Sequence, residues 1–430
     1  MRLSKFARIL IGIASIFVTN VRIEGFLIIA TVKLTSRKAR CPKCGRCCPG
    51  YDCRDKPSWW LHLGLGSFRF IIEYAPRRVE CPTCGVLVEK LPWARHDCRF
   101  SRDFEEMAAY LAQTTDKTSV SKLMGISWST TGNIIARVVA DKLDPRRLEE
   151  LTKVGIDEFS YRKRHRYITV VVDHEQRRVV WAGIGKGEVA LNEFFRELGK
   201  ERAAKLQVVT MDMSAGYIKS VQNNAEQAQI VFDRFHVQKL VSDAVDEVRR
   251  NLNNKYRERG DVDAAKTIKS SRFALLKSRF DISAKDQSKL ADIQNHNAPL
   301  YRAYLLKETL ADVFDEKTVE EAKAELNRWL AWASRSKLAP FVRVARTIRK
   351  FKERILAYIE SHLTNGLVEG FNNKLRMIAN RAFGFHSADA LIAVLFLCCG
   401  GIVLQSSFGV ANWLKKREKK IVKMGSEMWE

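Results

Sequence analysis

The pattern of hydrophobic and polar residues changes twice along the chain. Before residue 99 the apolar residues gather in short β-rich runs, as at 60–63 and 68–72, and these runs predict strands. From Arg102 the apolar residues recur at helical spacing, and after Pro145 strand and helix signals alternate. This order predicts a multidomain α/β protein with a strand-rich first module, a helical second module and a core built on a mixed sheet.

The helical module divides into three segments. Apolar residues at four positions between 104 and 111 share one face of the first segment, and Gly125 ends the second. The third segment, over 127–139, has Ser127 as its cap and a buried face at 134, 135 and 138. Two helices joined by a glycine turn at this spacing predict a helix-turn-helix, and a plain three-helix packing unit is the alternative.

In a helix-turn-helix the second helix of the motif enters the major groove of DNA. Contacts to base edges specify a sequence, whereas contacts to phosphates position the protein on the duplex. The exposed residues near the start of the third segment are therefore the candidate readers of base sequence. They are Trp128, Ser129, Thr130 and Asn133, of which we take Trp128, Thr130 and Asn133 as the DNA-binding residues.

After Pro145 three strands precede two helix–strand repeats, which predicts a mixed sheet. Two of the strands end in a carboxylate, Asp157 and Asp212, and strand ends are where α/β sheets place their ligands. Neighbouring carboxylates repel one another unless a cation lies between them, so the pattern predicts a divalent-metal site with a third acid. Ordinary exposed aspartates are the alternative. The predicted strands lie at 154–157, 167–172, 178–183, 206–212 and 229–233, and the helices lie near 188–198 and 217–221.

The segment 365–376 carries the best-marked third acid. Four polar residues recur there at i, i+3, i+4 and i+7, so they share one helix face, and apolar residues occupy the opposite face. Asparagine is a poor helix former at mid-helix, so its double use indicates that the amides orient another group. The polar residues are Glu369, Asn372, Asn373 and Arg376, and the apolar residues are Leu367, Phe371, Leu375 and Ile378.

Composition and charge narrow the class of partner. With 430 residues, 46% hydrophobic and 29% charged, the chain has room for about three folded domains and no long disordered tract. Lys plus Arg total 74 against 49 Asp plus Glu, and the net charge of +25 favours nucleic acid over a membrane or ribosome surface. The apolar runs at 9–18 and 390–404 are too short for a transmembrane helix, and no cleavable signal is evident. We therefore expect a cytoplasmic, nucleoid-associated protein with no membrane partner.

Eight of the ten cysteines lie between residues 41 and 98, which favours a local metal site. Two Cys-Pro-x-Cys-Gly knuckles repeat, and each turn brings two thiolates toward one cation. They predict a structural zinc ion in a ribbon with little core of its own, because four thiolates leave no open position for catalysis. Spare thiols are the alternative. The expected ligands are Cys41, Cys44, Cys81 and Cys84, and the possible competitors are Cys47, Cys48 and Cys53.

Five blocks carry a resemblance to a known family: Cys-Pro-Lys-Cys-Gly at 41–45, Arg-Arg-Val-Glu-Cys-Pro-Thr-Cys-Gly at 77–85, Ile-Asp-Glu-Phe-Ser at 156–160, Asp-Arg-Phe-His-Val at 233–237, and 365–373 followed by Arg-Ala-Phe-Gly-Phe at 381–385. Over nearly its whole length the chain resembles insertion-sequence transposases of the ISL-three family. The resemblance implies a DDE enzyme with an RNase H-like core and a catalytic triad of Asp157, Asp212 and Glu369. It matches Asp233 and His236 to an Asp-x-x-His that follows the second acid in related transposases, while the Cys47-Cys48 doublet departs from the family pattern.

The resemblance also accounts for the long polar helical stretch after Asp233 as an all-helical insertion into the core. Trp329 and Trp332 there favour buried packing over base stacking. Eight Lys or Arg against one Glu between 335 and 354 form either a phosphate track, with Arg346 and Arg349 as contacts, or a solvated helix face. The expected domains are a zinc ribbon (1–98), a helix-turn-helix domain (99–147), the first part of the core (148–245), the helical insertion (246–345) and the last part of the core with a basic tail (346–430).

The activity that follows from the resemblance is DNA transposition by a two-metal mechanism. Asp157, Asp212 and Glu369 would hold two Mg²⁺ ions, or Mn²⁺ in their place, for cleavage at the transposon ends and attack of the freed 3′-hydroxyl on target DNA. We expect double-stranded DNA as the partner and a homo-oligomer assembled on it. The alternatives are a non-catalytic zinc and helix-turn-helix regulator derived from a transposase, and an RNase H-like nuclease without strand transfer. The supporting residues would be Asp233, His236, Asn372, Asn373 and Arg376.

Overall fold

The structure is a computed structural model that describes residues 2–53, 56–162, 166–361, 366–381 and 387–404. The chain divides into two compact units, and each is described by itself. The first unit runs to Leu143 and also includes the chain from Phe396 onward. The second unit is Asp144–Leu395.

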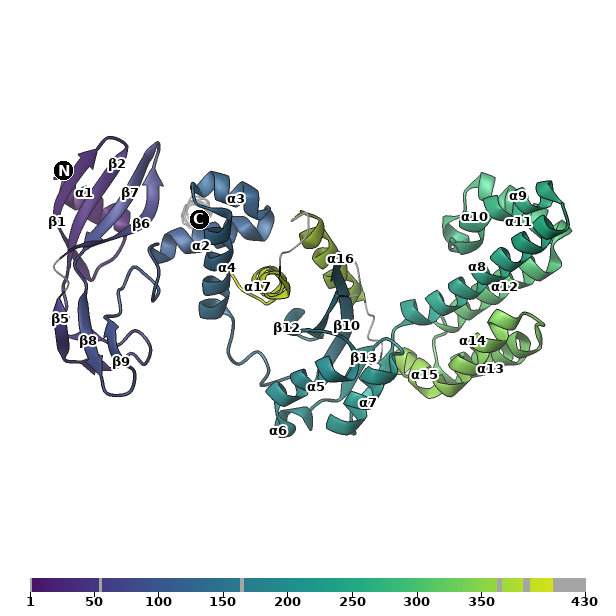
Figure 1. Cartoon of the computed structure of the whole chain (residues 1–430). Coiled ribbons are helices and arrows are strands. Elements are labelled where there is room, and N and C mark those ends of the chain that lie inside the picture. The colour runs from purple at the N-terminus through teal and green to yellow at the C-terminus, as the bar shows by residue number, and fades with distance from the viewer. Residues whose placement is uncertain (1, 54–55, 163–165, 362–365, 382–386, 405–430) are drawn as a thin grey trace, which may run out of the picture. The chain divides into compact units, whose positions relative to one another are not determined.

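A four-stranded sheet begins the first unit, in the order β1–β2–β7–β6 (Figure 1). Strand β2 pairs antiparallel with β1 and parallel with β7, and β7 pairs antiparallel with β6. Helix α1 packs against β1. The bounds are α1 Leu3–Ile11, β1 Ile16–Glu24, β2 Leu27–Leu34, β6 Ser58–Leu65 and β7 Phe68–Tyr74.

This sheet has a hydrophobic core of its own. The rings of Trp60 and Tyr74 meet Trp93 edge-on, with centroids 5.7 and 5.3 Å from it, and Ile11 and Ile72 are fully buried in the same cluster. Strands at 60–63 and 68–72 were expected and are present. They lie in a separate sheet from the cysteines, however, so the expectation of a single ribbon with little core is wrong for these residues.

The cysteines lie on two smaller sheets. Strands β3 and β4 pair antiparallel, and β8 lies between β5 and β9, antiparallel to both. The knuckle turns contain Gly45 and Gly85 at φ of 72° and 78°, a backbone conformation that glycine adopts without steric cost. The bounds are β3 Ala39–Arg40, β4 Cys47–Cys48, β5 Gly50–Cys53, β8 Arg77–Cys81 and β9 Gly85–Val88.

The three helices of the predicted helix-turn-helix follow. The Ser127 hydroxyl accepts a hydrogen bond from the Thr130 N–H (3.0 Å) and caps the third helix, as expected. Gly125 ends the second helix at φ 64°, and residues 134, 135 and 138 are buried as predicted. The bounds are α2 Arg102–Thr114, α3 Lys117–Met124 and α4 Trp128–Lys142.

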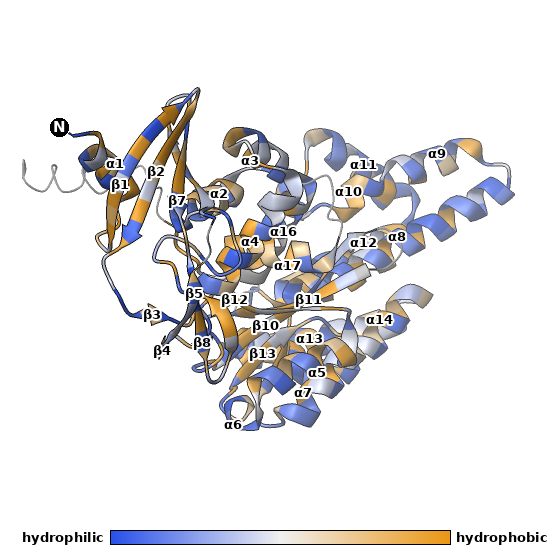
Figure 2. Ribbon diagram, turned by 60° about the vertical axis from the view of Figure 1, so that its left-hand side comes forward, coloured by the Kyte–Doolittle hydropathy of each residue, from blue (hydrophilic) through white to orange (hydrophobic). Residues whose placement is uncertain are grey.

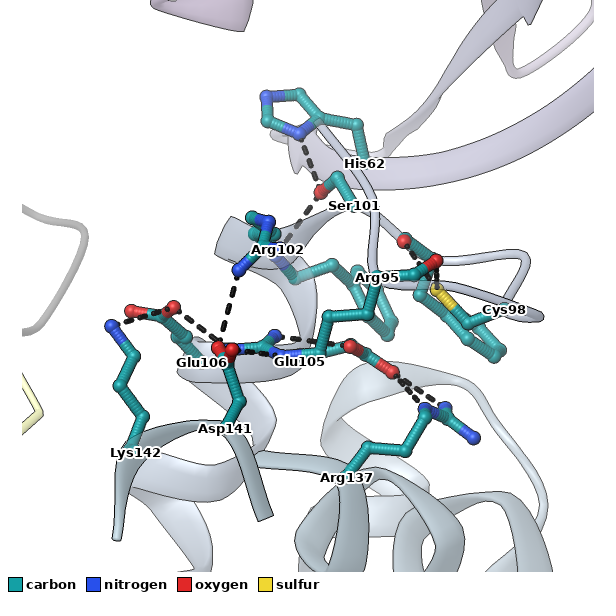
Figure 3. A network of polar contacts seen from close by, with 12 residues as sticks. His62, Arg95, Cys98, Ser101, Arg102, Glu105, Glu106, Arg137, Asp141 and Lys142 are labelled. Atoms are coloured by element: carbon teal, nitrogen blue, oxygen red, sulfur yellow. Dashed lines mark hydrogen bonds and ion pairs between the residues drawn. The ribbon is translucent and has the colours of Figure 1, made fainter. Parts of the chain in front are cut away.

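A cluster of charges joins the segment before α2 to helices α2 and α4 (Figure 3). The Arg95 guanidinium, 6% exposed, pairs with Glu105 and Glu106 of α2 (3.0 Å each) and with Asp141 of α4 (2.7 Å). The fully buried Glu105 carboxylate also pairs with Arg137 at 2.5 Å. Four ion pairs held this closely fix the angle between α2 and α4, because breaking one buried pair leaves its partner without solvation.

The second unit is built on a five-stranded mixed sheet in the order β12–β11–β10–β13–β14 (Figure 1). Strands β10, β11 and β12 form an antiparallel meander, and β13 and β14 run parallel to β10. The mixed sheet predicted after Pro145 is therefore present. The bounds are β10 Lys153–Arg162, β11 Arg166–Asp173, β12 Arg178–Ile184, β13 Val208–Met211 and β14 Gln229–Phe232.

Alternate residues of the central strands face opposite sides of the sheet. Ile156 and Met211 belong to the main core, together with residues of α5 (Gly187–Leu198) and α7 (Ala215–Asn224). Val208, Val231 and Ala357 form a separate cluster, so α15 covers the other face near β14. The short helix α6 is Lys200–Ala203.

Helices alone follow β14 in the described part of the chain. Trp329 is fully buried and its indole N–H donates to the Leu306 carbonyl (2.7 Å), which confirms packing rather than base stacking for this residue. Figure 2 shows mixed polar and apolar faces along these helices. The bounds are α8 Arg234–Glu258, α9 Val262–Ser270, α10 Arg272–Leu276, a 3₁₀ turn at Arg279–Asp281, α11 Ala284–His296, α12 Ala298–Val313, α13 Val319–Arg335, α14 Ala339–Lys350, α15 Lys352–Ser361, α16 Gly366–Arg381 and α17 Ala388–Cys399.

None of the helices in the described ranges combines the length and the apolar character needed to cross a lipid bilayer.

The charge cluster yields a stability prediction for the first unit. Arg95→Met should destabilise α2 and α4 by about 3 kcal/mol, because it removes the cation that three carboxylates share. Lys142→Ala is the control, since Lys142 pairs with Glu106 on the surface and should cost less than about 1 kcal/mol. Native-state hydrogen exchange of the α2 and α4 amides measures both. Equal losses of protection in the two variants would contradict a structural role for Arg95.

Candidate functional site

Asp157 and Asp212 lie side by side on adjacent parallel strands. Asp212 directly follows β13, as expected, whereas β10 continues past Asp157 to Arg162, so the expectation that a strand ends at Asp157 is wrong. The β10–β13 register pairs Gly155 with Thr210, and two further residues along each strand bring Asp157 opposite Asp212 on the same face. Both residues are half-buried. An oxygen of Asp212 accepts a hydrogen bond from the Ser214 N–H (3.0 Å), which orients the carboxylate at the start of α7.

Asp157, Asp212 and Asp233 form a row of three carboxylates across adjacent strands, and Asp233 lies at its end. Met211 pairs with Phe232, and the Asp233 N–H donates to the Met211 carbonyl (3.2 Å), so Asp233 follows Asp212 in register. It is 8% exposed and caps α8, because its Oδ1 accepts from the Phe235 N–H at 2.9 Å. The His236 Nε2 lies 3.7 Å from its other oxygen, so the predicted pair is in contact.

The segment predicted to carry the third acid forms helix α16, which packs against β10, the strand of Asp157. Asn373 and Arg376 lie on one exposed face, as expected, and Arg376 donates to the Asn373 amide oxygen at 3.1 Å. The side chains of Glu369 and Asn372 lie outside what the structure describes. The backbone of α16 therefore brings this helix to the strand, while the position of its acid stays a prediction.

Glu158 is a carboxylate that the sequence analysis missed. It is half-buried on the face opposite Asp157, at a strand position whose neighbours at 154 and 156 are core residues. Burial, followed by the nearby charge of Asp212, raises the pKa of Glu158, and a hydrogen bond with Tyr217 opposes that shift. Alternation along β10 was the available signal, because a Glu that continues the strand face of two core residues must find buried partners.

Tyr217 links Glu158 to the sheet. Its ring is fully buried in the core, and its hydroxyl lies 2.9 Å from the hydroxyl of Thr169, which is itself fully buried. Burial raises the pKa of Tyr217, so the phenol stays neutral and able to donate a proton in a hydrogen bond. Thr169 is the register partner of Glu158 on β11. The three side chains fix β10, β11 and α7 to one another directly behind the carboxylate row.

The four expected zinc ligands come together in the first unit. The sulfurs of Cys41, Cys44, Cys81 and Cys84 all lie within 4.8 Å of one another. Tetrahedral zinc–thiolate bonds of about 2.3 Å separate sulfurs by about 3.8 Å, so small movements would complete such a site. The Thr83 N–H lowers the pKa of Cys81 to about 6, whereas desolvation and the neighbouring sulfurs raise that of Cys84 to about 12. A divalent cation is what would allow four thiolates to ionise together.

The other cysteines of this region differ in their distance from the cluster. Cys48 lies against it, because its desolvated thiol interacts with the Cys81 sulfur and its pKa is raised. Cys47 and Cys53 are exposed and stand outside the four-sulfur group. The expected competition for ligands therefore narrows to Cys48.

The predicted DNA-reading residues at the start of α4 differ in their exposure and in their contacts. Trp128 is 42% exposed, and the Lys117 ammonium lies 3.3 Å from the centre of its ring. Asn133 is exposed, while the Thr130 hydroxyl lies 2.8 Å from that of Ser127 at the cap. Asn133 is thus the most open polar side chain of the three.

Arg346 and Arg349 lie on the exposed side of α14, whose opposite face is buried around Phe341 and Ile348. Arg349 donates to the Ser334 hydroxyl at 3.0 Å. The predicted basic helix face is therefore present and exposed.

A helix-turn-helix together with carboxylates in register on adjacent strands of a mixed sheet is typical of proteins that act on DNA. Comparison with family models agrees with this class. Residues 89–139 match the helix-turn-helix domain of transposase family ISL3, and residues 154–395, more than half of the chain, match the transposase model of the same family. The chain belongs to the ISL3 family of transposases, and the resemblance stated from its sequence blocks is confirmed.

Curated relatives are similar over most of their length. The chain is 38% identical over 401 residues to a transposase for insertion sequence element IS1557 from Mycobacterium tuberculosis, which covers 88% of this chain and 90% of the relative. It is 29% identical over 367 residues to a transposase for insertion sequence element IS1001 from Bordetella parapertussis, covering 83% and 88%.

Proposed function

We propose that this transposase binds the ends of its insertion sequence and catalyses phosphodiester cleavage and strand transfer with two divalent metal ions. The observation that carries the proposal is the row of carboxylates Asp157, Asp212 and Asp233, set in register across three adjacent strands with α16 packed against the first strand. Oxygen ligands from several elements at one sheet end are the donor set that Mg²⁺ prefers.

In this proposal Asp157, Asp212 and Glu369 hold two Mg²⁺ ions, or Mn²⁺ in their place. Such ions would activate the attacking oxygen and stabilise the leaving oxygen of a phosphodiester. Asp212 is oriented by the Ser214 N–H, and Asp157 is held by the β10 register, so neither carboxylate has to reorganise when a substrate arrives. Asp233, His236, Asn372, Asn373 and Arg376 are proposed to support the site.

Two reactions follow in sequence. In the first, water attacks the phosphorus at the transposon end, the P–O3′ bond breaks, and a free 3′-hydroxyl and a 5′-phosphate result. In the second, that 3′-hydroxyl attacks a target phosphorus, joins to it and displaces the target's own 3′-oxygen. Both are in-line displacements at phosphorus that need the same positioned oxygen ligands.

We propose an RNase H-like core for the second unit. The antiparallel meander β10–β11–β12, extended by two parallel strands with helices on both faces, supports this assignment. The helices from Arg234 to Lys350 supply the proposed insertion, which then extends beyond the expected bounds of 246 and 345 at both ends.

DNA recognition in this proposal is divided between two surfaces. The start of α4, with Trp128, Thr130 and Asn133, reads the transposon end, and Arg346 and Arg349 hold phosphates. Double-stranded DNA is the partner, and a homo-oligomer would form on it. A structural zinc ion on the four clustered cysteines would brace the first unit.

A non-catalytic DNA-binding regulator is the second candidate. It shares the helix-turn-helix and the cysteine cluster, so only the acids aligned on the adjacent strands separate the two candidates. A regulator would have no use for a row of like charges that destabilises its own sheet end, and the retention of Asp157, Asp212 and Asp233 in register therefore favours the enzyme.

Asp212→Asn tests the catalytic assignment. The amide keeps an oxygen for the Ser214 N–H but loses the charge that holds a metal ion, so cleavage of a transposon end should fall at least about 100-fold while end binding is kept. Asp312→Asn, which removes only a surface pair with Arg279, is the matched control. End cleavage by Asp212→Asn at the rate of the control would refute the site.

Metal analysis tests the cysteine cluster. The full chain should contain about one zinc ion, and Cys81→Ser with Cys84→Ser should lose it, because two of four thiolates are removed. Since β1, β2, β6 and β7 have their own core, this loss should expose the β8–β9 amides to hydrogen exchange more than those of β6 and β7. Zinc retained by the double variant would refute the ligand set, with Cys47→Ser as a control that keeps it.

Asn133→Ala tests sequence reading by α4. Removing one base contact should weaken binding to the cognate end by about 1–3 kcal/mol and barely change binding to random duplex. Ala136→Ser, also exposed on α4, is a control for a change that removes no polar group. Equal weakening on both DNAs would exclude Asn133 as a reader of sequence.

A further inference from the structure

A cleft of about 470 Å³ separates α7 from the turn between α14 and α15. We call it the α7–α15 cleft and define it by five cationic residues of its lining, which surround Phe351 and face one acid, Glu353. A lining of this kind differs from the apolar lining of most small-molecule sites. The cationic residues are Lys219, Arg349, Lys350, Lys352 and Arg354.

The cations of the α14–α15 side keep their charge. In the described contacts Lys352 donates to the Asn327 amide oxygen at 2.7 Å, and Arg349 donates to the Ser334 hydroxyl, both neutral partners. Arg354 lies 5.9 Å from the centre of the Phe351 ring. Arg343, also on α14, pairs instead with Glu247. Lys219, on the α7 wall of the cleft, likewise pairs with Glu188 at 3.1 Å. In the described contacts the unneutralised charge of the cleft therefore lies on its α14–α15 side.

The cleft lies at the sheet end that carries the carboxylates. Phe232, the residue before Asp233, meets Phe351 edge-on with centroids 5.2 Å apart, and Arg354 also lies over its ring at 5.9 Å. On the other wall Ala215 begins α7 only three residues after Asp212. A chain that passes through the cleft would thus pass beside the proposed active site.

Several like charges held around one hollow repel one another, and an anion of matching length relieves the repulsion. A lone phosphate would fill little of the volume, whereas a short run of phosphodiester backbone offers one charge per nucleotide. Among the lining residues Gln222 is the one uncharged polar side chain, so the cleft has almost no means to read bases. Recognition here would depend on charge and be independent of sequence.

We propose that the α7–α15 cleft binds the sugar–phosphate backbone of a DNA strand that runs into or out of the active site, without sequence preference. This inference rests on the proposed function. The strand has two possible sources of identical chemistry, the target DNA and the donor DNA that flanks the transposon end. Sequence-specific end recognition stays with α4, so the two surfaces have separate tasks.

The test uses the full chain with Lys219→Gln, Lys350→Gln and Lys352→Gln combined. The control combines Lys266→Gln, Lys269→Gln and Lys285→Gln, which are exposed on α9 and α11 and change the net charge equally. Three lost phosphate contacts should reduce the slope of log affinity against log salt for random duplex by about two to three in the cleft variant only. This binding readout needs no catalysis, so it remains valid if the proposed chemistry fails.

Two activity measurements, transfer of a pre-cleaved end and cleavage of a flanked end, distinguish target DNA from flanking donor DNA as the source of the strand. If the strand is target DNA, transfer of a pre-cleaved end should fall about 10-fold at low target concentration and recover at high concentration, with end cleavage unchanged. If it is flanking donor DNA, cleavage of flanked ends should fall while transfer of pre-cleaved ends is unchanged. Either result supports the cleft. A cleft variant that matches its control in salt slope and in both arms would overturn the inference.

Discussion

Repulsion between carboxylates in register on adjacent strands is the constraint on which the second unit depends. The β10–β13–β14 register brings Asp157, Asp212 and Asp233 into one row, where each negative charge raises the energy of the next. The sheet tolerates this because its other face packs Ile156, Met211 and neighbouring residues against α5 and α7. Backbone N–H groups at Ser214 and Phe235 relieve part of the charge without moving the strands.

Polar as well as apolar side chains stabilise the sheet behind the carboxylate row. Glu158, Tyr217 and Thr169 tie β10, β11 and α7 together on the face opposite Asp157. A buried carboxyl and phenol are costly unless each finds a partner, so this arrangement is stable only while the three elements keep their spacing. Glu158, Tyr217 and Thr169 therefore help to fix the positions of the carboxylates from the opposite face of the sheet.

The elements that could be predicted from sequence are those specified by local signals. Ser127 and Gly125 mark the ends of helices by capping chemistry, and the apolar run ending in Asp212 marks a strand end. The sheet β1–β2–β7–β6 escaped prediction because β2 and β7 are parallel neighbours that lie far apart in the chain, and no local pattern encodes such a pairing. Glu158 was missed since its partners Tyr217 and Thr169 are likewise distant.

The carboxylate row and the α7–α15 cleft each raise the electrostatic energy of the second unit, and their charges are opposite in sign. The row holds negative charges together, and the cleft holds positive charges together. Phe232, at the end of β14, directly precedes Asp233 of the row and contacts Phe351 and Arg354 of the cleft. Proposed divalent ions would relieve the row, and a phosphate backbone would relieve the cleft. Because ligands that bind only the folded arrangement stabilise it by mass action, the stabilisation of the assembled site by DNA should add to that by metal. On this argument the active geometry is completed by its substrate, which restricts DNA cleavage to molecules that already hold DNA.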